Sequence, residues 1–115
     1  MNRKALIRAY KEAKRPMGVF QVRNLAEGKS LIGTSRDLPA MLNRQLAQLR
    51  LGAHPSRELQ DDWKRLGPDG FSFATLDELE PAEDEPKTDP AEELALLETM
   101  WREKLAASGE RFYER

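Results

Sequence analysis

Two segments near the start of the chain have the residue pattern of short β-strands. In residues 18–25 hydrophobic side chains alternate with polar ones, which is the period of a strand with one buried face. Residues 24–29 (NLAEGK) favour a turn, because Gly28 readily adopts a positive φ. Residues 30–33 (SLIG) supply the second strand, so the pattern predicts an antiparallel β-hairpin.

Three later segments have the period of amphipathic helices. They cover residues 37–52, 56–67 and 90–109. Each begins at a residue that caps or starts a helix and ends at a glycine, the residue that most readily forms a C-cap. The expected buried stripes are Leu38, Leu42, Leu46 and Leu49; Leu59, Trp63 and Leu66; and Leu94, Leu97, Trp101 and Leu105.

The remaining segments complete an α+β pattern. Residues 71–79 (FSFATLDEL) alternate and predict a third strand, whereas residues 77–93 contain nine acids, one lysine and three prolines and predict an open acidic loop. We expect residues 1–16 to form a basic N-terminal helix that ends at Pro16 and either lies on phosphate or docks with its charged face in solvent. We therefore expect a small three-stranded antiparallel sheet flanked by helices in residues 17–115.

Composition narrows the class of protein. With 115 residues the chain is long enough for one domain, and no run approaches the ~20 apolar residues that a membrane helix needs. The basic N-terminus lacks the apolar core of a secretory signal. The absence of cysteine excludes disulfides and thiolate metal sites, and it suits the cytoplasmic location that we expect.

Charge is distributed unevenly along the chain. Residues 1–65 contain 14 Lys and Arg against 6 Asp and Glu, a net charge of +8, whereas residues 66–115 contain 5 against 14, a net charge of −9. A basic half favours an anionic partner, nucleic acid first. The alternatives are that the two halves face each other or that one charged run is simply solvated.

The order of several short motifs resembles the GIY-YIG nuclease family. The chain contains GVF (residues 18–20), LIGTS (31–35), a leucine-rich helix with NR, then LGAHPSRELQDDW (51–63), FSFATLDELE (71–80) and LLETMW (96–101). The resemblance covers most of the chain and implies a domain that hydrolyses or transfers phosphodiesters. That chemistry needs a base, a cation against the phosphate, a metal ion and a proton for the leaving oxygen.

Five groups that serve catalysis in active members of the family have no counterpart at the matching places of this sequence. The two signature tyrosines fall on Phe20 and Leu31, neither of which has a hydroxyl to move a proton. The helix arginine falls on Met41, although Arg44 lies one turn further along the helix. The helix histidine falls on Gln45, and the late asparagine has no clear match.

Two positions of the family pattern keep functional residues. His54 falls on the loop histidine, and its alternative is a plain surface residue. Glu98 falls on the metal-binding glutamate and lies within the predicted apolar stripe of the last helix. A carboxylate held there needs a metal, an Arg or Lys, or water, unless it reaches solvent from the edge of the stripe.

These residues support three hypotheses. The first is a GIY-YIG-type domain that binds nucleic acid, DNA in first place, with weak or absent cleavage and no small-molecule cofactor. The second is an active endonuclease with His54 as base and Glu98 holding Mg²⁺ or Mn²⁺. In it Arg44, together with Arg36 or Arg23, would clamp the phosphate, and Tyr10 or Tyr113 would be the acid. The third is a protein-interaction or regulatory scaffold.

Overall fold

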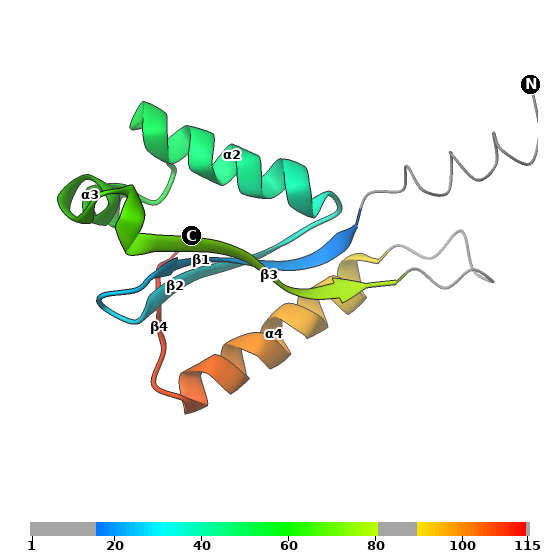
Figure 1. Ribbon diagram of the computed structural model, residues 1–115. Coiled ribbons are helices and arrows are strands. Elements are labelled where there is room, and N and C mark those ends of the chain that lie inside the picture. The colour runs from blue at the N-terminus through cyan, green and yellow to red at the C-terminus, as the bar shows by residue number, and fades with distance from the viewer. Residues whose placement is uncertain (1–15, 81–89, 115) are drawn as a thin grey trace, which may run out of the picture.

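A four-stranded mixed sheet with helices on both faces forms the body of the protein (Figure 1). The structure, a computed structural model, describes residues 16–80 and 90–114. Its elements are β1 (Met17–Asn24), β2 (Lys29–Ser35), α2 (Leu38–Leu51), α3 (Arg57–Leu66), the 3-10 turn η1 (Pro68–Gly70), β3 (Phe71–Leu79), α4 (Ala91–Ala107) and β4 (Arg111–Phe112). The strand order is β3-β1-β2-β4; α2 and α3 cover one face, and α4 covers the other (Figure 1).

The predicted hairpin is confirmed, and its register decides which side chains share a face. Phe20 lies opposite Gly33 and Val22 lies opposite Leu31 in the antiparallel β1–β2 pair. Opposed residues share a face of the sheet, so the side chains of Phe20, Val22 and Leu31 all point toward α2 and α3. The turn uses Gly28 at a φ of 62°, as expected.

The predicted helix boundaries and caps are also confirmed. The Asp37 side chain accepts a hydrogen bond from the backbone N–H of Ala40 at 3.2 Å, and α2 ends at Gly52 with a φ of 75°. The Ser56 side chain caps α3 by accepting from the backbone N–H of Leu59 at 3.3 Å. The core against this face of the sheet consists of Phe20, Val22, Leu31, Leu38, Leu49, Leu59, Trp63, Phe71 and Tyr113.

The prediction of three antiparallel strands is wrong, because a fourth strand joins the sheet in parallel. In β4, Arg111 pairs with Lys29 and Phe112 pairs with Ser30 of β2. The backbone N–H of Tyr113 continues this contact by donating to the Ser30 carbonyl at 2.8 Å. Two residues are too few to show a period of two, so this strand had no signal in the sequence.

The predicted acidic loop is partly occupied by regular structure. Residues 77–79 belong to β3 and residues 91–93 belong to α4. Residues 81–89 and the predicted N-terminal helix lie outside the described residues. Within the described ranges, no helix combines the length and apolar character that crossing a membrane requires.

Candidate functional site

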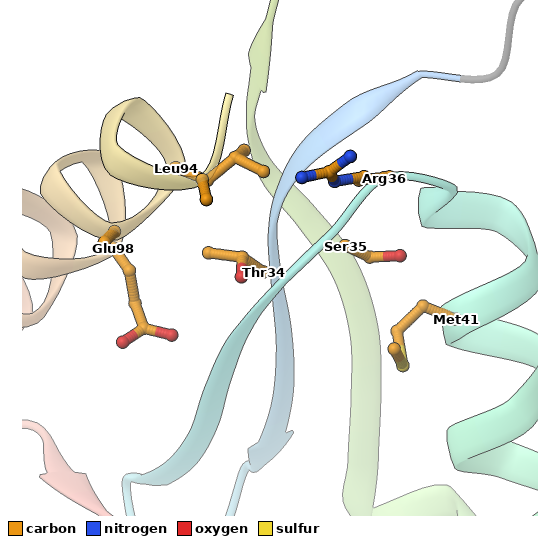
Figure 2. A pocket seen from close by; sticks show the side chains of 8 residues that line it. Thr34, Ser35, Arg36, Met41, Leu94 and Glu98 are labelled. Carbon is orange, nitrogen blue, oxygen red and sulfur yellow. The ribbon is translucent and has the colours of Figure 1, made fainter. Parts of the chain in front are cut away.

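An open cleft of about 450 Å³ lies where the end of β2 passes between α2 and α4 (Figure 2). The described residues that line it are Thr34, Ser35, Arg36, Met41, Ala91, Leu94, Ala95 and Glu98. The cleft exists because β4 pairs only with Lys29 and Ser30, so among the described strands the rest of this β2 edge has no neighbour.

Three of the residues singled out in the sequence meet at this cleft. Met41 projects from α2 and Glu98 from α4, with the end of β2 between them (Figure 2). Arg36, on the connection from β2 to α2, also lines the cleft. Met41 and Glu98, to which the resemblance assigns the positions of the arginine and of the metal-binding glutamate, therefore line one cavity.

Phe20 and Leu31 are not among the described residues that line the cleft. Each is 3% exposed and belongs to the apolar core under α2 and α3. Met41 is half-buried and packs against that same core while also lining the cleft. At the two positions to which the resemblance assigns the signature tyrosines, the side chains are buried hydrocarbon.

Glu98 has a cationic partner on its own helix. Its side chain is 15% exposed, and Arg102 Nε donates to Glu98 Oε2 at 3.3 Å. Arg102 Nη2 also donates to the backbone carbonyl of Ile32 on β2 at 2.9 Å. The expectation that a carboxylate in this stripe needs a partner is met by an arginine, and the i, i+4 spacing of the pair was visible in the sequence.

His54 is buried in the α2–α3 connection and is 8% exposed. The Ser56 backbone N–H donates to its Nδ1 at 3.0 Å, so Nε2 carries the proton and donates to Gln45 Oε1 at 2.6 Å. Burial lowers the pKa of His54, which favours this neutral ring. Gln45 Nε2 in turn donates to Met41 Sδ at 3.5 Å, so His54 reaches the cleft only through Gln45.

This geometry bears on the predicted role of His54 as a base. Both of its ring nitrogens are engaged, so it would have to break a hydrogen bond before it accepted a proton from water. His54 does not line the cleft that contains Glu98. Its role as a base stays a prediction, and in this structure the ring joins the start of α3 to the middle of α2.

The three arginines proposed to clamp phosphate lie in different places. Arg23 makes a two-point ion pair with Glu110, with its Nε and Nη2 2.9 and 3.2 Å from the two carboxylate oxygens. This hydrogen-bonded pair raises the pKa of Arg23 and lowers the pKa of Glu110. Arg44 is exposed on α2. Of the three, only Arg36 lines the cleft.

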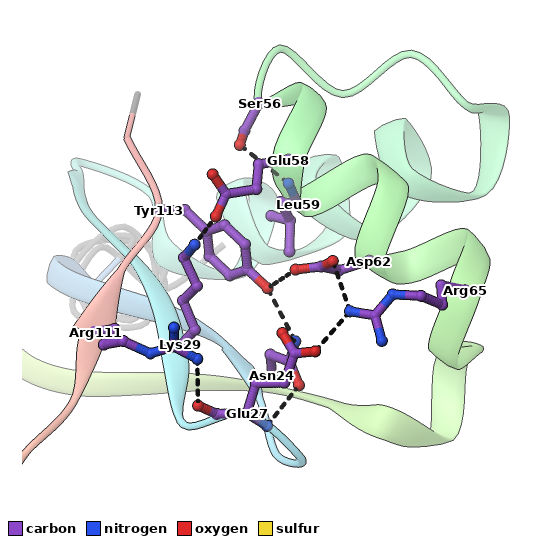
Figure 3. A network of polar contacts seen from close by, with 10 residues as sticks. All are labelled: Asn24, Glu27, Lys29, Ser56, Glu58, Leu59, Asp62, Arg65, Arg111 and Tyr113. Atoms are coloured by element: carbon purple, nitrogen blue, oxygen red, sulfur yellow. Dashed lines mark hydrogen bonds and ion pairs between the residues drawn. The ribbon is translucent and has the colours of Figure 1, made fainter.

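Tyr113, a candidate acid, belongs to a polar network at the opposite end of the hairpin (Figure 3). Its side chain is 1% exposed; its hydroxyl donates to Asp62 Oδ2 at 2.7 Å and accepts from Asn24 Nδ2 at 3.1 Å. Burial raises the pKa of this hydroxyl. Arg65 joins Asp62 to Glu27 in the same network. We call these five residues the hairpin lock; Tyr10 lies outside the described residues.

The ligands needed for a divalent cation are sparse at the cleft. Within residues 16–80 and 90–114, no three His, Asp or Glu side chains cluster in a way that would hold a metal ion. Glu98 is the one carboxylate among the described lining residues, and it is paired with Arg102. Mg²⁺ accepts one or two carboxylates together with phosphate oxygens and waters, so the donor set alone is thin, and the arginine competes for it.

The fold is shared with solved nuclease domains. The sequence matches no protein-family model and no curated protein. The structure of the catalytic domain of homing endonuclease I-TevI is similar at a TM-score of 0.64 and 21% identity, over 86% of this chain and 99% of that one. A mutant of the catalytic domain of intron endonuclease I-TevI gives a TM-score of 0.63 and 21% identity, over 86% and 92%. The chain therefore has a GIY-YIG-like α+β fold.

Proposed function

We propose that this chain is a divergent GIY-YIG-type domain that binds nucleic acid, DNA in first place, and cleaves phosphodiesters weakly or not at all. One observation carries the proposal: Phe20 and Leu31, at the two signature positions, are buried hydrocarbon side chains within a fold shared with an endonuclease domain. In support of the proposal, Met41 and Glu98 line one cleft, and the two side chains at the positions assigned to proton-transfer groups have no hydroxyl.

The cost to catalysis follows from the chemistry of each replacement. Loss of one proton-transfer group typically lowers a rate by ~10²–10⁴. Here two hydroxyls are absent, and Met41 contributes no charge against a phosphate. Such losses are seldom additive. Together they leave, among the described lining residues, one arginine and one glutamate that is paired with Arg102, whereas the reaction needs a base, a cation, a metal ion and a proton donor.

Binding is supported by charge rather than by catalytic groups. The first 65 residues carry a net charge of +8, from 14 Lys and Arg against 6 Asp and Glu. Arg36 lines the cleft, and Arg44 is exposed on the helix that forms one of its walls. Cationic side chains that contact phosphates release counterions, so binding of this kind weakens steeply as salt rises.

The first experiment measures retention of branched, duplex and single-stranded DNA between ~50 and ~200 mM salt. We expect binding that falls steeply with salt and that is weakened by Arg44→Glu. Lys104→Glu is the matched control, because it makes the same charge change at an exposed position on α4 whose ammonium lies over the Trp101 ring rather than at the cleft. A protein that retains no DNA even at low salt contradicts the proposal and favours a protein-interaction scaffold.

The second experiment tests cleavage in Mg²⁺ or Mn²⁺. We expect little or no cutting by the wild-type protein. We expect a measurable gain when Phe20→Tyr, Leu31→Tyr and Met41→Arg are combined with Arg102→Gln, which removes the cation paired with Glu98. Each single change is the control for the set, because the three groups act on one phosphate. Efficient cutting by the wild type that is lost in both Glu98→Ala and His54→Ala contradicts the proposal and identifies an active enzyme with a rearranged site.

A further inference from the structure

Arg102 lies where α4, β2 and β4 meet, and three contacts hold it there. Its Nε is 3.3 Å from Glu98 Oε2, its Nη2 donates to the Ile32 carbonyl at 2.9 Å, and its Cζ lies 5.4 Å from the centre of the Phe112 ring. The side chain is 29% exposed. A guanidinium held by a carboxylate, a carbonyl and an aromatic ring has little freedom to leave.

The Ile32 contact is set by the sheet and not by Glu98. The Gly28 and Ser30 carbonyls accept from the backbone N–H groups of Arg111 and Tyr113, so these carbonyls point out of the β2 edge. Backbone groups alternate along a strand, which places the Ile32 carbonyl next in line on the same edge. Arg102 donates to this carbonyl, just beyond the point where the C-terminal segment stops pairing with β2.

We infer that the Arg102 guanidinium occupies the place beside Glu98 that the family resemblance assigns to a divalent cation. This cleft therefore binds phosphate without a metal ion. The donor set of the described residues does not fit a resident Mg²⁺ or Mn²⁺, because the one carboxylate among the described lining residues already has a cation at 3.3 Å. A dication that approached Glu98 would meet a fixed positive charge at short range in a partly desolvated site. Only the phosphate ligand in this inference rests on the proposed function.

The test is a titration with Mn²⁺ alone, followed by the electron paramagnetic resonance signal of free Mn²⁺. We expect the wild type to show no binding beyond that of Glu98→Gln. Arg102→Met and Arg102→Gln, which remove the charge, are expected to bind Mn²⁺ about tenfold tighter or more. The gain is expected to disappear when either change is combined with Glu98→Gln.

The controls separate a specific effect from general electrostatics and from loss of structure. Lys104→Met removes one positive charge from the same helix at a side chain that lies over Trp101 rather than beside Glu98, so it is expected to leave Mn²⁺ binding unchanged. Arg102→Gln keeps a donor for the Ile32 carbonyl, so one uncharged variant retains an anchor to β2. Glu98-dependent Mn²⁺ binding by the wild type, or no gain in either folded Arg102 variant, overturns the inference.

Nucleic acid enters only in a second arm, which keeps the two proposals distinguishable. DNA retention at equal ionic strength is expected to be the same with Mg²⁺ and with a chelator, and a requirement for Mg²⁺ overturns the inference. If no DNA is retained in either condition while the Mn²⁺ titrations behave as expected, the proposed function fails and the role of Arg102 beside Glu98 stands.

Discussion

The two ends of the β1–β2 hairpin use polar groups in opposite ways. At the turn, the hairpin lock buries Asn24 and Tyr113 at 0% and 1% exposure, and their polar atoms are hydrogen-bonded to each other and to neighbouring carboxylates. Further along the two strands from the turn, Phe20 and Leu31 put buried hydrocarbon where the family resemblance expects two tyrosine hydroxyls. Among the described residues the buried tyrosine is Tyr113, which packs in the core and hydrogen-bonds to Asn24 and Asp62 at the turn end of the hairpin.

The difference shows where the chain depends on polar chemistry for stability. Among the described residues, every buried side-chain nitrogen or oxygen has a hydrogen-bond partner. A buried group that loses its partner costs more than the hydrogen bond contributed, so a complete network is sensitive to any single deletion. At the cleft end, which has fewer buried polar groups, substitutions should change stability mainly through packing.

The largest expected effect is at the centre of the hairpin lock. Tyr113→Ala removes a buried aromatic ring and leaves Asn24 and Asp62 without their shared partner, so we expect a loss of about 3–5 kcal/mol in the free energy of unfolding. Urea denaturation measures this loss. Phe112→Ala, at the half-buried neighbouring residue, is the control and is expected to cost less; equal costs would show that the lock adds nothing beyond local packing.

A pair of opposite substitutions compares the two ends directly. Tyr113→Phe deletes a hydroxyl that is bonded to Asn24 and Asp62, and we expect it to cost about 1–3 kcal/mol. Phe20→Tyr adds a hydroxyl within an apolar core and is expected to cost about 1–3 kcal/mol through overpacking and desolvation. Thermal or urea unfolding of both variants checks this; a Phe20→Tyr protein as stable as wild type would mean that a tyrosine at this position finds a polar partner.

The third prediction concerns pH. Burial lowers the pKa of His54, so below the unfolded-state pKa of about 6.5 the unfolded chain binds a proton that the folded chain resists. Stability should therefore fall as pH drops from 7 to 5, by at most about 1.4 kcal/mol per pH unit for one proton. His54→Gln should flatten this slope in urea unfolding at several pH values, and an unchanged slope would show that another group causes it.

A further decline in the free energy of unfolding is expected at lower pH, because two carboxyl groups become protonated. Arg23 holds the pKa of Glu110 low. Burial raises the pKa of Asp62, but the hydrogen bonds from Arg65 and Tyr113 outweigh burial and leave it lowered. The stabilisation that each carboxylate contributes is present above a pH of about 4 and is lost as pH falls through its folded-state pKa. Asp62→Asn should therefore make the free energy of unfolding depend less on pH in this acid range.

The smallest expected effect is at the cleft. The Glu98–Arg102 pair is partly exposed, at 15% and 29%, so Glu98→Gln should change the free energy of unfolding by less than about 1 kcal/mol. Urea unfolding measures it, with Glu103→Gln at an exposed position on the same helix as the control. A loss in the free energy of unfolding as large as that of Tyr113→Ala would show that the two ends of the hairpin do not differ in their dependence on polar contacts.

Much of the fold could be predicted from short-range patterns. The hairpin, the caps at Asp37 and Ser56, the stripe containing Trp63 and the third strand all lie where the sequence indicated. Each depends on residues within a few positions of one another, where side-chain period and backbone preference act directly. β4 could not be predicted in this way, because its two residues are held by pairing with β2 and not by their own pattern.

The candidate site was predictable only in its composition. By itself the sequence determined that Phe20 and Leu31 have no hydroxyl and that Met41 carries no charge, and it predicted that Glu98 lies within the apolar stripe of its helix. Only the tertiary structure decided that Met41 and Glu98 share a cleft, that Arg23 is engaged by Glu110 and that Arg102 reaches the β2 edge. The physical reason is that these contacts join residues far apart in the chain, and they form only when sheet register and helix packing bring the side chains together.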